Sequence, residues 1–424
     1  MWQHGKIVLS PTSDWLSQIQ NLKRLRRISS LFGKTSNSSS RNRLLLPYIL
    51  SADVETTGLK TWDPKITATN LATWDNYGRG KSWHHREFTD HRLDHEGTKL
   101  FYNAKFDIMM LNKAGIRVKG PIIDVLLVAQ MLLPDERSKG LKHLTRKLLK
   151  DPYLEEMEVK KWLRKNKSTN YGDVPAHIIE PYNLKDAKAT LELFHYLLGQ
   201  MDAYRMWPVL EREMKLMPIV IRMEQTGVLI DMAAVDRIAI AAQKEASKLK
   251  TKMCALTKNP LFTPNSHPQV SAAIYDVSAM PRRFNKKTVK PQGNALSLLE
   301  QPNALGSLVV RYRKVTKAMN TYLKHFRNVD VNGRLHANFN QGAARTGRFS
   351  SSEPNLQNVP RPEESYLGEL RSCIVASPDC RLLFIDYSQI EMRLAAHFSQ
   401  EESMLAAYAA GADLHGITCT KMFE

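Results

Sequence analysis

The sequence predicts a mixed α/β domain up to about residue 205, then a mostly helical region, then a segment that mixes short strands with helices. An apolar run over residues 44–50 has the length of a buried strand and leads into Ser51-Ala52-Asp53. Helical periodicity follows over 122–133, 140–150 and 185–200. A strand with helices after it is typical of an α/β domain.

The second half of the chain carries longer helical patterns and one further apolar run. The predicted helices cover 207–227, 231–256, 305–327, 389–398 and 416–424, and the predicted strand covers 381–385. We therefore divide the chain into a basic extension (1–44), an α/β domain (45–205), a helical region (206–335) and an α+β segment (336–424).

Length and charge narrow the class of protein. The chain has 424 residues, room for roughly three domains, with 43% hydrophobic and 24% charged residues, as in soluble globular proteins. Lys and Arg number 61 against 42 Asp and Glu, a net charge of +19. This balance favours a polyanionic partner, usually nucleic acid. An ordinary basic protein has the same charge, so charge alone decides nothing.

The positive charge is concentrated between Asp276 and Asp330, where Glu300 is the one acid. The basic residues of this block are Arg282, Arg283, Lys286, Lys287, Lys290, Arg311, Arg313, Lys314, Lys317, Lys324 and Arg327. Such a block repels itself unless it faces anions, and phosphates are suitable anions.

The ends and the cysteines carry weaker signals. Residues 1–44 combine basic residues with a Ser/Asn-rich run. This composition fits a nucleic-acid arm or a targeting peptide, and most simply a loosely ordered leader. Cys254, Cys373, Cys380 and Cys419 have no metal-site spacing and fit a reducing compartment. No apolar stretch is long enough to span a bilayer, so we expect a cytoplasmic protein.

Two acids lie at the end of the first predicted strand, in Asp53-Val54-Glu55. Side chains alternate along a strand, so Asp53 and Glu55 share a face and repel each other unless a cation is present. Hard oxygen ligands of this kind suit Mg²⁺ or Mn²⁺. Such a pair of acids also occurs at ordinary solvated strand ends. The interpretation as a metal site therefore needs further acids elsewhere in the chain.

Two later segments supply that support. Asp107 ends Asn103-Ala104-Lys105-Phe106-Asp107 within an apolar stretch, where an acid requires a partner. Tyr182 and Asp186 open a predicted helix and lie on one of its faces, since they are four residues apart.

These three motifs, in this order, resemble the DEDD exonucleases of the subclass with tyrosine in its third motif. The resemblance implies a ribonuclease H-like fold and hydrolysis with two Mg²⁺ or Mn²⁺ ions. It makes Tyr182 the residue that orients the attacking water. The implied metal ligands are Asp53, Glu55, Asp107 and Asp186. The alternative is an exonuclease fold that is retained only as a scaffold.

Residues 345–360 form a long segment rich in Gly, Ser and Asn with Arg345 and Arg348 at its start. Small polar side chains and amides suit contacts to a phosphate backbone or to minor-groove acceptors. Together with residues 211–231 and the helix of Arg313, Lys317, Thr321 and Tyr322, this segment resembles DNA polymerase family A. The resemblance implies a thumb that grips duplex phosphates. The implied contacts to primer and template are Arg345, Arg348, Asn355, Gln357 and Asn358, with Arg313 and Lys317 in the thumb.

Residues 382–393 predict a strand, an acid and a helix, and resemble motif A of the same polymerase family. The resemblance implies a palm domain in which Asp386 and the main-chain carbonyl of Tyr387 bind the catalytic Mg²⁺ ions. It makes Glu391 the residue that disfavours ribonucleotides. It places His415 near the incoming triphosphate.

The fingers helix and a second palm acid in a His-Asp-Glu turn would follow in the family, and the chain contains no His-Asp-Glu tripeptide. We therefore expect a proofreading 3′→5′ exonuclease joined to a truncated or split DNA polymerase of a bacterium or phage. The expected partners are single-stranded 3′ ends and primer–template DNA, with dNTP if a downstream polymerase fragment completes the site. An RNA-trimming DEDD exonuclease and a non-catalytic DNA-binding subunit stay open as alternatives.

Overall fold

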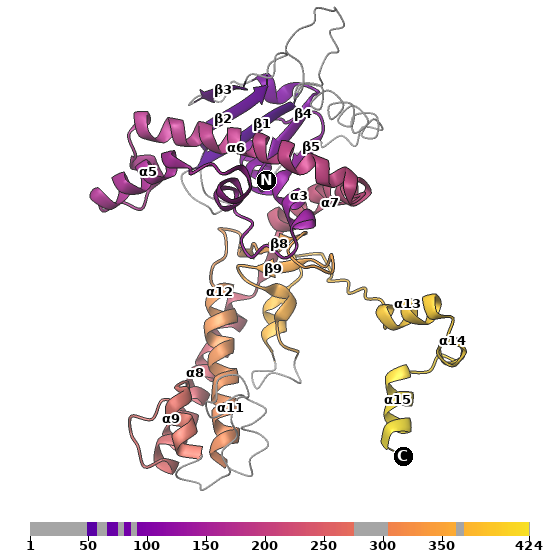
Figure 1. The fold of residues 1–424 in the computed structure, drawn as a ribbon. Coiled ribbons are helices and arrows are strands. Elements are labelled where there is room, and N and C mark those ends of the chain that lie inside the picture. The colour runs from indigo at the N-terminus through magenta and orange to yellow at the C-terminus, as the bar shows by residue number, and fades with distance from the viewer. Residues whose placement is uncertain are drawn as a thin grey trace, which may run out of the picture. The chain divides into compact units, whose positions relative to one another are not determined.

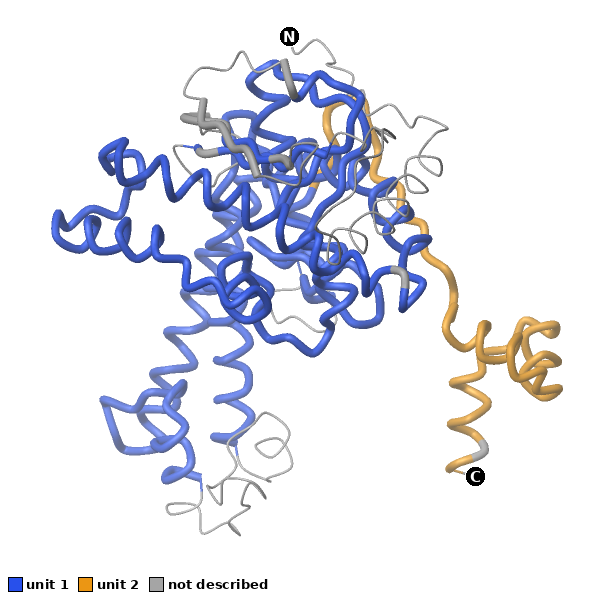
Figure 2. Tube along the Cα trace, turned by 45° about the horizontal axis from the view of Figure 1, so that its top comes forward, with its two compact units in different colours: residues 1–374 blue, residues 375–424 orange. Residues whose placement is uncertain are grey.

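The computed structural model describes residues 49–56, 66–74, 80–85, 91–274, 304–361 and 369–423. The chain divides into two compact units, Met1–Ile374 and Val375–Glu424, which are described one at a time (Figure 2). The predicted extension over 1–44 lies outside the described residues.

A five-stranded sheet in the order β3-β2-β1-β4-β5 forms the centre of the first unit. Its strands are β1 (Ile49–Thr56), β2 (Ile66–Trp74), β3 (Gly80–His85), β4 (Thr98–Phe101) and β5 (Ile122–Asp124). The pairs β1–β2 and β2–β3 are antiparallel, whereas β1–β4 and β4–β5 are parallel. The strand predicted before Asp53 is thus the central strand of the sheet.

Polar residues inside the sheet explain why the sequence pattern predicted only one of these strands. Asn70 on β2 and Thr98 and Lys99 on β4 are buried and interrupt the expected apolar runs. The ammonium of Lys99 donates hydrogen bonds to the main-chain carbonyls of His95, Gly97 and Lys119, and burial lowers its pKa to about 8.

Helices cover the sheet and share its core. They are α2 (Ala104–Lys113), α3 (Val125–Leu132), α4 (Leu141–Leu144), α5 (Leu154–Lys165) and α6 (Ala176–Ala203). The long helix α6 packs across β1, β2 and β3 (Figure 1). The helix predicted over 122–133 was wrong at its start, because residues 122–124 form β5. The helix predicted over 140–150 is α4 followed by a π-helical turn over Thr145–Leu149.

The prediction that Tyr182 opens a helix was wrong. Helix α6 begins at Ala176 and contains Pro181 in its interior. A proline lacks the N–H that continues a helix, so the Glu-Pro step looked like a boundary. Packing of α6 against three strands offsets the hydrogen bond that Pro181 cannot donate.

The helical region begins with α7 (Trp207–Thr226), and all three helices predicted here are confirmed. The others are α8 (Met232–Leu256), α9 (His267–Ala272), α11 (Ala304–Lys317) with a π-helical segment (Ala318–Leu323), and α12 (Lys324–Phe326). Helices α8 and α11 lie side by side (Figure 1) and enclose a second core with Leu249, Val309 and Phe326. The basic residues between 282 and 290 lie outside the described residues.

Gly227 ends α7 in a conformation that other residues rarely adopt, with φ 58° and ψ −174°. A Cβ here would lie 2.7 Å from the carbonyl oxygen of Leu335 and 2.9 Å from Nδ1 of His336. We therefore expect Gly227→Ala to lower the free energy of unfolding by about 2 kcal/mol or more. Urea unfolding of both proteins measures this, with Gly115→Ala as a control for the positive φ alone, because nothing lies within 4 Å of a Cβ at Gly115.

Short strands complete the first unit. They are β6 (Val228–Ile230), β7 (Arg334–Leu335), β8 (Asn338–Asn340) and β9 (Ser350–Ser352), and β10 (Ile374–Val375) lies at the boundary of the two units. β6 pairs with β7, and β8 pairs antiparallel with β9 with Phe339 opposite Ser351. A single turn of 3₁₀ helix, Leu356–Asn358, follows β9.

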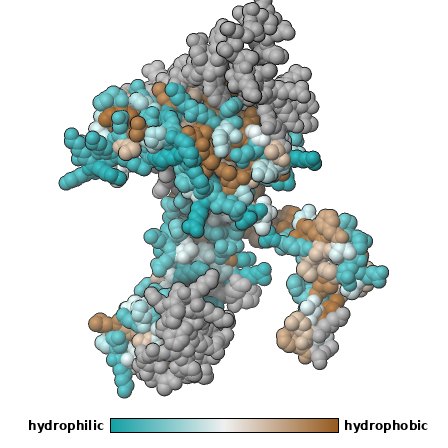
Figure 3. Space-filling view, viewed as in Figure 1, coloured by the Kyte–Doolittle hydropathy of each residue, from teal (hydrophilic) through white to brown (hydrophobic). Residues whose placement is uncertain are grey.

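The second unit consists of α13 (Ile390–Ser399), α14 (Glu402–Ala409) and α15 (Leu414–Phe423). The helices predicted over 389–398 and 416–424 are present, but the strand predicted over 381–385 was wrong. Its side chains Leu383, Phe384 and Ile385 are 81–86% exposed. Figure 3 shows hydrophobic patches on the surface of this unit. A strand needs a neighbour for its main-chain hydrogen bonds, and the described residues of this unit offer none. No described helix is long and apolar enough to cross a membrane.

Candidate active site

The first motif lies on the central strand of the sheet. Asp53 of β1 is half-buried and pairs across the strands with Asn70, whereas Glu55 pairs with Ala68. Alternation along β1 places residues 53 and 55 on the same face of the sheet, as predicted. The side chain of Glu55 lies outside what the structure describes.

The second motif lies on α2 and is bonded directly to β1. Asp107 is 4% exposed, and its Oδ1 accepts a hydrogen bond of 3.0 Å from the main-chain N–H of Val54. Val54 is the residue between Asp53 and Glu55. This bond therefore holds the second motif beside the first.

A buried acid that the sequence analysis did not consider fixes the start of α2. Asp124 accepts hydrogen bonds from the main-chain N–H groups of Asn103 (2.9 Å) and Ala104 (3.0 Å), and also caps α3 through Leu126. Burial raises its pKa to about 6, although these main-chain donors oppose the shift. Asp124 thus orients α2, and with it Asp107.

The third motif carries an acid whose two oxygens are both bonded. Oδ1 of Asp186 accepts a hydrogen bond of 2.5 Å from the hydroxyl of Tyr153, and Oδ2 lies 3.3 Å from Nζ of Lys142. Burial raises the pKa of Asp186, and the Lys142 ammonium opposes that shift. Burial, followed by the charge of Asp186, raises the pKa of the Tyr153 hydroxyl far above its usual value, so this group is a constant donor.

Lys142 also joins Tyr182 to Asp186. Its ammonium donates a hydrogen bond to the Tyr182 hydroxyl and lies 4.4 Å from the centre of the Tyr182 ring. The charge of Asp53 contributes to the raised pKa of Tyr153, so the acid of the first motif lies close enough to act on this cluster. The structure therefore joins Tyr182 and Asp186 through Lys142, and α6, the helix that carries both, packs against β1, the strand of Asp53.

Sequence reasoning missed Lys142 and Tyr153. Neither belongs to one of the three motifs, and no spacing rule connects residue 142 or 153 with residue 186. One weak signal was available: Lys142 occurs where helical periodicity starts in a strongly basic segment, 137–150. Only the packing of α4 and α5 against α6 brings these side chains to the acids.

The residues present fit a divalent cation in the chemistry of their donors. The candidate ligands are carboxylates, which Mg²⁺ and Mn²⁺ prefer, and the helix of Asp186 packs against the strand of Asp53. Among the described side chains no group of three or more His, Cys, Asp or Glu is arranged to hold a metal ion. The side chain of Glu55 is not among these described side chains, and the ammonium of Lys142 supplies one positive charge beside Asp186.

The candidate DNA contacts of the helical region differ in exposure. Arg313 is half-buried: its Nε donates a hydrogen bond of 3.0 Å to the carbonyl of Pro264, and burial lowers its pKa. Lys317 on the same helix is exposed. The geometry thus gives Arg313 a role in packing as well, whereas Lys317 is open to solvent.

The segment after β9 holds several candidates together. The Asn355 side chain accepts a hydrogen bond of 3.1 Å from the N–H of Gln357, whose side chain donates to the carbonyl of Phe349 (3.2 Å). The Tyr322 hydroxyl donates to the carbonyl of Asn358. These bonds fold the segment back on itself and onto the helical region.

The two arginines of this segment are exposed. Arg345 lies 2.9 Å from Asp135 in a surface ion pair, with both side chains more than 70% exposed. Such a pair holds its partners weakly, so Arg345 remains able to bind an external anion.

In the second unit Asp386, Tyr387, Glu391 and His415 are all exposed. Hydrogen bonds hold the carboxylate of Asp413 in place: it accepts one from the Gln389 side chain (2.5 Å) and one from the N–H of His415 (3.1 Å). The bond from Gln389 is the largest cause of the lowered pKa of Asp413. Among the described residues of this unit no group of three or more His, Cys, Asp or Glu is arranged to hold a metal ion.

Comparison with known proteins assigns both halves of this arrangement. Residues 49–202 match the family model of the 3′-5′ exonuclease domain, and residues 232–424 match that of DNA polymerase family A. Residues 232–424 of this chain belong to DNA polymerase family A. The chain combines an exonuclease domain that carries Asp53 and Asp186 with a polymerase region of mostly helical character.

Relatives of this family A chain are bacterial. It is 32% identical over 343 residues to DNA polymerase I of Chloroflexus aurantiacus, covering 77% of this chain and 35% of that protein. It is 30% identical over 355 residues to DNA polymerase I of Pseudomonas aeruginosa, covering 78% and 37%. The family A chain thus spans about a third of the length of these relatives.

A solved structure has the same fold. The POL domain of Pol1 from M. smegmatis, in complex with DNA primer-template and dNTP, superimposes with a TM-score of 0.71 over 90% of this family A chain and 64% of that chain. The two sequences are 22% identical, so the likeness concerns the fold.

Proposed function

We propose that the chain is a metal-dependent 3′→5′ DNA exonuclease joined to part of a family A DNA polymerase. One observation supports the exonuclease: in the domain that matches the exonuclease family, Asp107 is bonded to Val54, between Asp53 and Glu55, and Lys142 joins Tyr182 to Asp186. The strand order β3-β2-β1-β4-β5 is in keeping with a ribonuclease H-like fold.

In the proposed reaction water adds to the phosphorus of the last phosphodiester, the bond to the 3′ oxygen breaks, and a nucleoside 5′-monophosphate leaves. Asp53, Glu55, Asp107 and Asp186 would hold two Mg²⁺ or Mn²⁺ ions, which activate the water and neutralise the leaving oxygen. Lys142 holds the Tyr182 hydroxyl, so that it can orient the water. Tyr153 holds Asp186 in one orientation.

The proposed domains are those that the sequence predicts, and the matches over 49–202 and 232–424 support only the division between an exonuclease and a polymerase region. We assign 45–205 to the exonuclease domain, 206–335 to a thumb and 336–424 to part of a palm. The net charge of +19 supports a nucleic-acid partner, and the M. smegmatis neighbour was solved with primer-template and dNTP. We propose the same classes of ligand here: single-stranded 3′ ends, primer–template DNA and dNTP, in the cytoplasm of a bacterium or phage-infected cell.

The polymerase half is proposed to need a further polypeptide segment. Leu383, Phe384 and Ile385 are exposed directly before Asp386, although an apolar run of this kind is normally buried. A segment that pairs with residues 382–385 would convert them into a strand and cover these side chains.

The proposal predicts digestion that depends on a divalent cation. A 5′-labelled single-stranded DNA should shorten from its 3′ end in Mg²⁺ or Mn²⁺, release nucleoside 5′-monophosphates, and stay intact in EDTA, because the acids cannot act without the cation. Gel electrophoresis of the products measures this. Digestion in EDTA, or none in either metal, would disprove the proposal. Faster digestion of RNA of the same sequence would instead favour the RNA-trimming alternative.

A further inference from the structure

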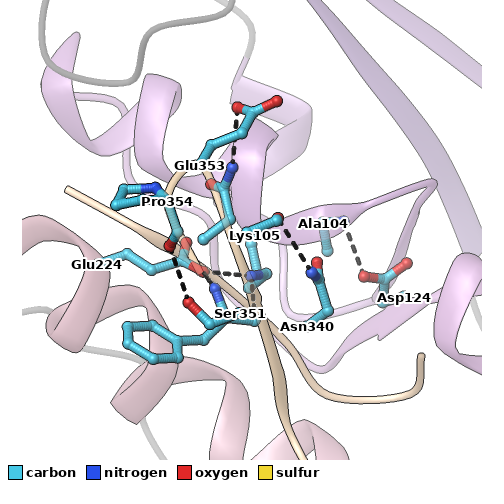
Figure 4. A network of polar contacts seen from close by, with 11 residues as sticks. Ala104, Lys105, Asp124, Glu224, Asn340, Ser351, Glu353 and Pro354 are labelled. Atoms are coloured by element: carbon cyan, nitrogen blue, oxygen red, sulfur yellow. Dashed lines mark hydrogen bonds and ion pairs between the residues drawn. The ribbon is translucent and has the colours of Figure 1, made fainter. Parts of the chain in front are cut away.

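A buried ion pair outside the active site joins three elements that are distant in the sequence. Nζ of Lys105, on α2, lies 2.5 Å from Oε1 of Glu224, on α7, and both contact Phe339 of β8. The side chains of Lys105 and Glu224 are only 12% and 4% exposed. Figure 4 shows Lys105 and Glu224 pointing toward each other, with the strand of Asn340 beside them.

The pair is bonded to both main-chain groups of Phe339. Nζ of Lys105 donates to the Phe339 carbonyl (2.6 Å), and Oε1 of Glu224 accepts from the Phe339 N–H (2.6 Å). Alternate residues of an antiparallel strand direct these groups to opposite edges, so β8 bonds to β9 on one edge and to the ion pair on the other. The pair thus takes the place of a neighbouring strand.

A buried charge pair is a costly way to hold a fold together. Desolvation of the two ions offsets most of their attraction, and apolar residues of similar size often stabilise a protein as well or better. The added hydrogen bonds to Phe339 fix the position of β8 along its axis, which apolar packing would not fix. This chemistry is therefore better suited to setting the register of β8 than to adding stability.

On one side the pair leads to the exonuclease acids. Lys105 lies on the same helix as Asp107, two residues before it, and Asp107 is bonded to Val54 between the acids of the first motif. A displacement of α2 at Lys105 would therefore move Asp107 relative to Asp53.

On the other side the pair leads to the segment proposed to contact the primer. Ser351, opposite Phe339, accepts a hydrogen bond from the N–H of Leu356 (3.3 Å) and donates one to the carbonyl of Pro354 (3.2 Å). The Asn340 side chain donates to Ser352 (3.4 Å). These bonds tie β8 and β9 to the turn of Asn355 and Gln357.

We infer that Lys105 and Glu224 are positioning residues that couple the exonuclease site to the primer-binding segment. The inference rests on the proposed function. The pair holds α2 and the β8–β9 strands in one register, so that a primer end frayed from a duplex bound at residues 345–358 arrives at the acids of the exonuclease domain. A free single strand does not need this register.

The test compares two substrates in the full chain. One is a 5′-labelled single strand, and the other is the same strand annealed as a primer with a mismatched 3′ end. In Glu224→Gln we expect the ratio of the duplex rate to the single-strand rate to fall at least about fivefold, because coupling between sites is typically of that size or larger. Glu211→Gln on the same helix, whose partner Lys215 is 2.7 Å away at the surface, should leave the ratio unchanged.

A second variant separates positioning from stability. Lys105→Met with Glu224→Leu fills the same space with apolar side chains and leaves no unpaired charge, so it should lower the midpoint of urea unfolding less than Glu224→Leu alone, which leaves the Lys105 ammonium without its carboxylate. The ratio should still be low, because neither side chain can bond to Phe339. Hydrogen exchange at the Phe339 amide should be faster in this double variant than in the wild-type chain.

Three results would overturn the inference: an unchanged ratio in Glu224→Gln, an equal loss on both substrates, or a normal ratio in the apolar double variant. If the wild-type chain digests neither substrate, the proposed function itself fails. If it digests both and the variants keep its ratio, only the coupling fails.

Discussion

Replacing Asp53 and Glu55 together with alanine should lower the rate of single-strand digestion by more than about 100-fold, since losing even an outer partner of a metal ligand costs 10–100-fold. Asp53 lies on β1, against which the helix of Asp186 packs, and Glu55 follows on the same strand face. Without them the cation would keep only Asp107 and Asp186. Quenched-flow or gel assays of a labelled single strand give the rate.

The fold should survive this change. Asp53 and Glu55 are like charges on neighbouring positions of one face, so their removal relieves repulsion. An unaltered circular dichroism spectrum and melting temperature would confirm it. The matched control is Asp94→Ala with Glu96→Ala, an exposed acidic pair of the same domain, which should digest at the wild-type rate. A double variant at 53 and 55 with wild-type activity would disprove the assigned site.

The sequence predicted elements well where a regular apolar pattern coincided with a clear end. Helix α7 is an example, because Gly227 can adopt a backbone conformation closed to other residues. Helix α8 is another, because the Asp231 side chain accepts a hydrogen bond from one of the free N–H groups of the first turn, that of Ala234. The central strand was predicted from its apolar residues alone.

Elements whose stability comes from distant packing could not be predicted. Strand β4 contains the buried Lys99, whose ammonium donates hydrogen bonds to three main-chain carbonyls. No local sequence pattern indicates that a lysine can be buried in this way. Helix α6 continues through Pro181 because the sheet supports it. Residues 381–385 have the composition of a strand. A strand forms only when it pairs with a neighbouring strand, and the described residues provide no such partner for 381–385.

The same distinction applies to the active site. The acids were predictable, because each chemical role requires a carboxylate within a short motif. Their supports were not, because Lys142, Tyr153 and Asp124 act through space on residues far along the chain. Among these supports Lys142 has the most contacts with candidate catalytic groups, and its replacement has the second large effect that we expect.

Lys142→Met should lower the turnover rate of the exonuclease by about 10–100-fold, the usual effect of removing a partner of a metal ligand. The variant loses the hydrogen bond to the Tyr182 hydroxyl and the charge 3.3 Å from Asp186. KM for a single strand should change little, because Lys142 orients groups within the site. Lys142→Arg should restore part of the rate, since it keeps a charge and donors in a different geometry.

Metal affinity distinguishes positioning by Lys142 from simple support of the fold. The Lys142 ammonium competes with a divalent cation for Oδ2 of Asp186 and repels that cation. The Lys142→Met variant should therefore bind Mn²⁺ at least as tightly as the wild-type chain, although it digests DNA more slowly. Electron paramagnetic resonance of free Mn²⁺ measures the affinity without any assay of activity. Lys161→Met, an exposed lysine on α5, is the control and should change neither quantity. If affinity and rate fall together in Lys142→Met, the lysine supports the local fold and does not orient Tyr182.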